Sequence, residues 1–207
     1  MQIFPGAVLE NSAGRRCAVG PVIRCEGNWY TFVPAYVFEG EKKVFQAGTG
    51  LLVGEIVADH RPGDDNARVD VTEIVRLVRF FAYAPVQVEK SLRVRQADPM
   101  DFLGQKVLKR DGMATTAGRV VSVDGPFSLA TPDGGVKTYD GAVSVKSEHE
   151  EVVIAQKGDG GASIISPLAN ALVGVLIGVA GGECYCVPGN ALIARYFPGF
   201  DNLDMVA

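Results

Sequence analysis

The chain has 207 residues, of which 47% are hydrophobic, and its formal net charge at pH 7 is −4. This length suffices for one domain of two similar halves, or for two small domains, with a sizeable core. The acidic balance gives no global positive field for nucleic acid. No segment reaches the roughly 18 apolar residues of a membrane span. We therefore expect a globular protein that binds neither nucleic acid nor membrane.

Cysteines and histidines are few, which limits metal and disulfide chemistry. Cys184 and Cys186 are two residues apart on an expected strand, so their side chains share one face at a spacing too long for an easy disulfide. With no Cys-x-x-Cys and only two histidines, we expect no metal and no cofactor. The segment 1–6 lacks the charged start and apolar core of a signal peptide. We therefore expect reduced thiols and a cytoplasmic location in the host or producing cell.

The first half of the chain consists of short β-type segments. The runs 21–25 and 29–33 flank Glu26-Gly27-Asn28, which is a hairpin signal. Segments of strand composition follow within 43–57, and a long one within 69–77. Between them, 61–67 is a turn-forming surface loop. We interpret 1–85 as one barrel of strands and 86–100 as the connection to the second half.

The second half begins with a hairpin and ends with a helix. The stretch 103–123 reads as two antiparallel strands around Gly112, and we expect the basic residues of 106–110 on a solvated strand edge. Further strands are expected before and after the glycine-rich turn Gly158-Asp159-Gly160-Gly161. The residues 190–197 suit a closing helix. We interpret 101–198 as a second barrel with this helix, and 199–207 as a loose tail.

The glycine-rich turn gives the chain a resemblance to a known family. It is followed by the apolar strand 171–178 and by Cys184-Tyr185-Cys186-Val187-Pro188 directly before the expected helix. This order resembles the C-terminal barrel of the trypsin-like (chymotrypsin-fold) serine proteases, in their compact viral or bacterial form. The resemblance implies an all-β fold of two six-stranded antiparallel β-barrels with a short C-terminal helix.

Two of the three positions of the family's catalytic triad carry other residues here. Gly160 stands in the place of the serine nucleophile, and Tyr36, in Val33-Pro34-Ala35-Tyr36-Val37, in the place of the histidine base. Glycine has no group to acylate, and a phenol with a pKa near 10 is a poor base at neutral pH. The acid would come from Asp70, with Glu73 or a loop aspartate as alternatives, and we expect either carboxylate to form local hydrogen bonds.

These positions lead to a hypothesis of lost catalysis. We expect a proteolytically inactive homologue that is not an enzyme and acts as a structural or binding module. One form of this hypothesis is a virus-encoded particle or polyprotein component, located in the virion, with a protein partner or self-assembly. Another is a regulator that occupies peptide without cutting it. The alternative is an active protease with a rewired or laboratory-mutated site, in which Ser163 or His149 would be a weak replacement.

Overall fold

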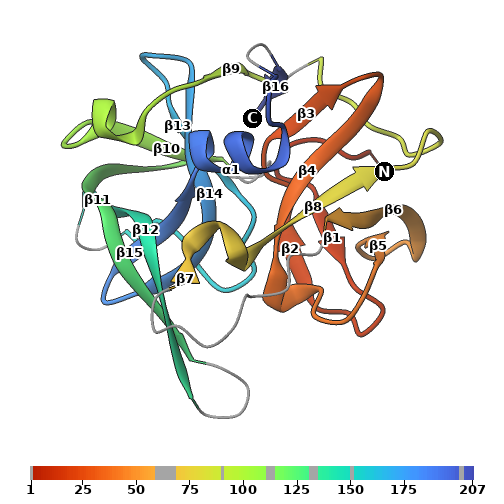
Figure 1. Cartoon of the computed structure of the whole chain (residues 1–207), viewed down its shortest axis with the longest axis horizontal. Coiled ribbons are helices and arrows are strands. Elements are labelled where there is room, and N and C mark those ends of the chain that lie inside the picture. Colours follow the sequence, from red (N-terminus) through yellow and green to blue (C-terminus); the bar gives the residue numbers. More distant parts are fainter. Residues whose placement is uncertain are drawn as a thin grey trace.

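The computed structural model describes the whole chain except residues 1, 59–68, 90, 111–114, 131–134, 150–151 and 201–202. The expected loop 61–67 and the turn at Gly112 therefore lie outside the described residues. In the rest of the chain, β-strands in two barrels dominate, and one short helix lies against both (Figure 1). The all-β architecture expected from the sequence is confirmed.

The N-terminal barrel is an antiparallel sheet whose order is β2-β1-β5-β6-β8-β4-β3. Its strands are β1 (Val8–Glu10), β2 (Arg16–Ala18), β3 (Val22–Cys25), β4 (Asn28–Pro34), β5 (Lys43–Gln46), β6 (Leu51–Ala58) and β8 (Val75–Phe80). The β3–β4 hairpin turns at Glu26 and Gly27, which both have positive φ values of 48° and 79°. This is the two-residue turn whose twist matches the flanking strands.

The C-terminal barrel closes on itself through the order β13-β10-β11-β12-β15-β14 and back to β13, with every pair antiparallel. Its strands are β10 (Lys106–Arg110), β11 (Thr115–Ala130), β12 (Val136–Ser147), β13 (Ser163–Ser166), β14 (Ala171–Ala180) and β15 (Glu183–Pro188). The long strands β11 and β12 continue beyond the barrel as a ribbon that extends away from the body (Figure 1).

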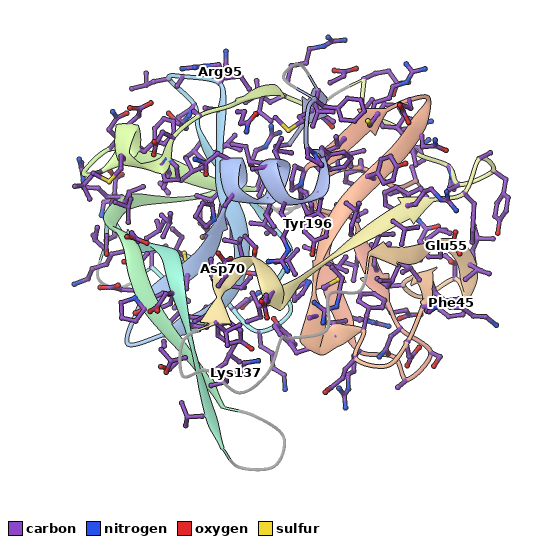
Figure 2. The ribbon with its side chains drawn as sticks, viewed as in Figure 1. Phe45, Glu55, Asp70, Arg95, Lys137 and Tyr196 are labelled. Atoms are coloured by element: carbon purple, nitrogen blue, oxygen red, sulfur yellow. The ribbon has the colours of Figure 1, made fainter. Side chains whose placement is uncertain are left out.

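Three buried clusters hold the two barrels. One fills the N-terminal barrel and one fills the C-terminal barrel. The third lies between the barrels and joins side chains of both to the helix α1 (Gly189–Tyr196). There Phe32 of β4 packs near Phe197, with ring centroids 6.3 Å apart, and the Tyr196 hydroxyl donates to the carbonyl of Val75. Figure 2 shows Tyr196 where the helix meets β8. The helix thus fixes one barrel against the other.

Two segments outside the expected strands are strands in the structure. The tail expected at 199–207 contains β16 (Asp204–Val206), which pairs with β3 and with β9 (Arg93–Gln96) inside the expected connection. Met205, Val206 and Ala207 are buried. The expectation of a loose tail is therefore wrong. The edges of β3 and β9 pair with this short apolar segment and supply its backbone hydrogen-bond partners. Strand β9 also pairs in parallel with β14.

Short irregular elements complete the described chain. They are the 3₁₀ turns η1 (Ala35–Val37), η2 (Val71–Ile74) and η3 (Pro99–Phe102), and the strand β7 (Val69–Asp70), which pairs in parallel with β12. No helix in the described ranges has the length and apolar character needed to cross a lipid bilayer.

Candidate functional site: the cleft between the barrels

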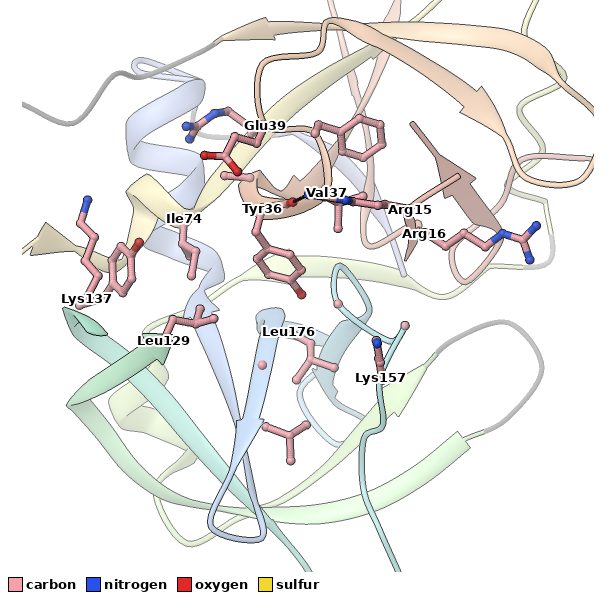
Figure 3. Close-up of a pocket in the computed structure, with 18 of the residues that line it drawn as sticks. Arg15, Arg16, Tyr36, Val37, Glu39, Ile74, Leu129, Lys137, Lys157 and Leu176 are labelled. Atoms are coloured by element: carbon pink, nitrogen blue, oxygen red, sulfur yellow. Dashed lines mark hydrogen bonds between the residues drawn. The ribbon is translucent and has the colours of Figure 1, made fainter. Parts of the chain in front are cut away.

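A cleft of about 1390 Å³ lies between the two barrels. One wall comes from the turn after β4 and from η2, and the other comes from the glycine-rich turn and β14. The β11–β12 ribbon adds Leu129, Lys137 and Tyr139. Figure 3 shows the Tyr36 ring in the middle of this cleft, between residues of both barrels.

Tyr36 is held at the cleft by local backbone structure. β4 ends at Pro34, whose fixed φ of −64° precedes the single turn η1 that carries Tyr36. The residue is 41% exposed, but its hydroxyl end lies between the barrels and donates to the Ile177 carbonyl at 3.3 Å. Burial, together with the nearby Cys17, raises the pKa of Tyr36 to about 12. At neutral pH Tyr36 is therefore a hydrogen-bond donor that keeps its proton.

The glycine-rich turn faces Tyr36 from the other barrel. Gly158 and Gly161 have φ values of +104° and +96°, a conformation that favours glycine. A Cβ added to Gly160 would lie 2.5 Å from the Tyr36 hydroxyl oxygen and 3.1 Å from a side-chain carbon of Pro34. Any larger residue at position 160, serine included, therefore requires Tyr36 to move. The sequence motifs placed these two residues in one site, and the structure brings them into contact.

A buried ion pair joins the glycine-rich turn to strand β10. The Asp159 carboxylate accepts from the Lys109 ammonium at 2.5 Å and from the Gln156 backbone N–H at 2.9 Å. Lys109 is almost fully buried, so the expectation that the basic residues of 106–110 line a solvated edge is wrong for this residue. Its side chain points inward from β10 because β-strands alternate their faces. Sequence reasoning missed this pair, since the charge of Lys109 concealed its inward position.

The turn also makes direct backbone contact with the N-terminal barrel. The Ala18 N–H donates to the Gly160 carbonyl at 2.8 Å, whereas the Gly161 N–H donates within the C-terminal barrel to the Leu176 carbonyl at 2.8 Å. A Cβ on Gly161 would overlap the Ala18 carbonyl oxygen. The glycines therefore serve close barrel-to-barrel packing as well as turn geometry.

The structure separates Asp70 from Tyr36 and Gly160. The Asp70 carboxylate accepts from the Thr72 N–H at 2.7 Å and from the Thr72 hydroxyl at 2.5 Å, and so caps η2. It does not line the cleft, whereas Glu73, one turn later, does. One carboxylate oxygen of Glu73 is buried and has no hydrogen-bond partner among the residues that the structure describes. Glu73, the alternative to Asp70 for the acid position, thus lies in the cleft wall that also carries Tyr36.

The two weak replacement candidates lie outside the cleft lining. Ser163 is fully buried in β13, and its hydroxyl has no partner in the described chain. His149 is exposed after the end of β12. Among the described residues, neither is hydrogen-bonded to Tyr36 or Gly160, and neither lines the cleft.

An open strand edge runs along the floor of the cleft. β14 pairs with β13 only as far as Val175, while its other edge stays paired with β15 to Ala180. In the described chain, residues 177–180 thus have no strand on the cleft side. The Ile177 carbonyl faces the cleft, and the alternation of an antiparallel strand turns the N–H and C=O of Val179 to the same side. Val179 lines the cleft and is 45% exposed.

Comparison with known proteins identifies the fold. Neither the protein-family models nor the curated proteins gave a match. Among solved structures, a glutamic-acid-specific serine protease matches with a TM-score of 0.68 at 15% identity, over 99% of this chain and 100% of that one. An alpha-lytic protease homologue matches with a TM-score of 0.68 at 23% identity, over 100% and 99%. A chymotrypsin from Cellulomonas bogoriensis matches with a TM-score of 0.64 at 19% identity, over 99% of this chain and 98% of that one.

The chain therefore has the chymotrypsin-like serine protease fold over its whole length, as the sequence motifs implied. The expectation that it is not an enzyme is contradicted by these comparisons, because the solved structures that share its fold are serine proteases. That expectation was drawn from single positions of the motif, whereas the comparisons cover the fold as a whole.

Proposed function

We propose that this chain binds an extended segment of another protein along the open edge of β14, in the cleft between its barrels. The observation that carries the proposal is the edge of residues 177–180, which no strand of the described chain pairs on the cleft side, inside a cleft of about 1390 Å³. An exposed strand edge binds an extended chain through backbone hydrogen bonds, while pockets along it select side chains. Residues of both barrels and of the ribbon would flank the bound segment.

Hydrolysis of the bound segment is a second candidate function, favoured by the serine proteases that share the fold. In a rewired site of this kind, the glycine-rich turn would supply backbone N–H groups and another residue would supply the nucleophile. Glu73 and Glu39 are the carboxylates that line the cleft together with Tyr36, and Glu73 is the one considered for the acid position. Binding and hydrolysis use the same cleft, so one experiment can examine both.

A peptide library tests the proposal. The protein is incubated with random decapeptides, and mass spectrometry identifies both the peptides that co-elute with it and any new peptide ends. We expect a subset to co-elute, and Val179→Pro to remove this binding because proline lacks the N–H that faces the open edge. Val153→Pro is the matched control, at an exposed valine outside the cleft lining. New ends would identify hydrolysis, whereas equal retention by both variants would contradict edge binding.

The role in a virus particle remains a prediction of the sequence. Light scattering of the purified chain tests it, because a particle component should form large assemblies, whereas a peptide-binding protein need not.

A further inference from the structure

The charge of the cleft is opposite to the charge of the whole chain. The chain carries a net charge of −4, whereas the described side chains that line the cleft include five cations and two anions. These are Arg15, Arg16, Arg76, Lys137 and Lys157, against Glu39 and Glu73. A cleft that concentrates one sign of charge selects ligands of the other sign.

Two of these cations have neither a carboxylate nor an aromatic partner in the described chain, whereas Lys137 lies over the Tyr139 ring. The Arg15 guanidinium donates only to the backbone carbonyl of Tyr36, at 3.4 Å, and has no carboxylate partner there. The exposed Lys157 immediately precedes Gly158 and makes no ion pair within the described ranges. Arg16 differs, because Glu10 already neutralises it at 3.1 Å. Arg15 and Lys157 are therefore the available charges.

The two ends of the cleft differ in character. In Figure 3, Arg15, Arg16 and Lys157 lie on one side of the Tyr36 ring, and Ile74, Leu129 and Lys137 lie on the other. On that second side, Lys137 stands 5.4 Å from the centre of the Tyr139 ring, and Leu129 and Ile74 present apolar surface. The first end therefore favours carboxylates, and the second combines the Lys137 cation with an apolar wall that suits an apolar side chain.

We propose that the segment bound in this cleft is acidic, with carboxylate side chains at Arg15 and Lys157 and an apolar side chain at Ile74 and Leu129. This inference rests on the proposed function, and it names the chemistry of the ligand. The two cations belong to different barrels, so an acidic segment would bridge the barrels at the point where Tyr36 faces Gly160. Glu39 and Glu73 would attract lysine and arginine side chains, but the five cations outnumber these two carboxylates and would repel such side chains.

Fluorescence anisotropy with matched peptides tests this proposal. A decapeptide with one leucine and three glutamates is compared with the same peptide carrying glutamine at the three acidic positions. At low salt we expect the acidic form to bind about tenfold more tightly, and the difference to shrink as salt screens the charges. Lys157→Glu should weaken the acidic peptide by about tenfold and leave the glutamine peptide within about twofold.

The control variant is Lys146→Glu, which makes the same charge change on an exposed lysine of β12 outside the cleft lining. It should change the affinity for either peptide by less than about twofold. Equal affinity for both peptides would overturn the acidic preference while leaving segment binding intact. Absence of binding by both, together with an empty library experiment, would overturn the proposed function itself.

Discussion

Removal of the Lys109 ammonium should destabilise the chain far more than removal of an equally short ion pair at the surface. Lys109–Asp159 and Arg79–Glu55 both have nitrogen–oxygen distances of 2.5 Å. The side chains of the first pair are 4% and 12% exposed, whereas those of the second are 44% and 39% exposed. The two pairs therefore isolate the effect of burial. Figure 2 shows Glu55 on the outside of the N-terminal barrel.

The expected magnitudes follow from electrostatics. At an effective dielectric constant of about 20, charges this close attract by roughly 6 to 7 kcal/mol. Desolvation of the two ions offsets most of this gain, so the intact buried pair contributes little net stability. In Lys109→Met, however, Asp159 stays buried without its partner, which costs about 3 to 5 kcal/mol. Arg79→Met should cost about 0 to 1 kcal/mol.

Urea unfolding followed by circular dichroism measures the difference. With a slope of about 2 kcal/mol per molar urea, Lys109→Met should lower the midpoint by about 1.5 to 2.5 M. Lys109→Met/Asp159→Asn should recover part of this loss, because no buried charge remains. Equal midpoint shifts for Lys109→Met and Arg79→Met would refute the conclusion that burial of the pair supports the turn.

Three further predictions concern Tyr36. Its phenol should ionise near pH 12, measured as the difference in phenolate absorbance between the protein and Tyr36→Phe. Because the folded pKa lies above the unfolded value of 10, the contribution of Tyr36 to stability is complete below pH 10 and is lost as the pH rises through 12. Ionisation near pH 10 would show an unburied hydroxyl. Tyr36→Phe should also bind peptides about threefold to tenfold more tightly, because the Ile177 carbonyl loses its internal donor, and unchanged affinity would show that this carbonyl takes no part in binding. Finally, Gly160→Ala should lower the free energy of unfolding by about 1 to 3 kcal/mol in the presence of Tyr36 and by clearly less in Tyr36→Phe. Unfolding measurements of this double-mutant cycle test the contact, and additive effects would show that the two residues do not interact.

The sequence predicted those parts of the site that depend on local motifs. The strand ending at Pro34 and the glycine pattern 158–161 were recognised locally, and the resemblance to the protease family implied that Tyr36 and Gly160 share one site. The closing helix at 190–197 was also predicted within one residue, because Pro188 marks its start and apolar residues follow with helical spacing. The end of the strand, the position of the turn and the start of the helix depend mainly on residues that are neighbours in the chain.

The remaining features depend on partners far away in the sequence. Asp70 caps the 3₁₀ turn η2 and Glu73 lies within it, so spacing alone did not indicate which carboxylate reaches the cleft. β16 is three residues long and gains its stability from β3 and β9, which local composition does not show. The open edge of β14 likewise exists only because β13 ends its pairing at Val175.

The central claim is that an extended segment docks on the cleft edge of β14, and amide hydrogen exchange at Val179 measures it most directly. In the presence of a saturating acidic peptide, exchange of the Val179 amide should slow markedly because the amide gains a hydrogen-bond partner, while the Val153 amide outside the cleft should exchange as before. Unchanged exchange at Val179 in the peptide-bound protein would contradict the claim.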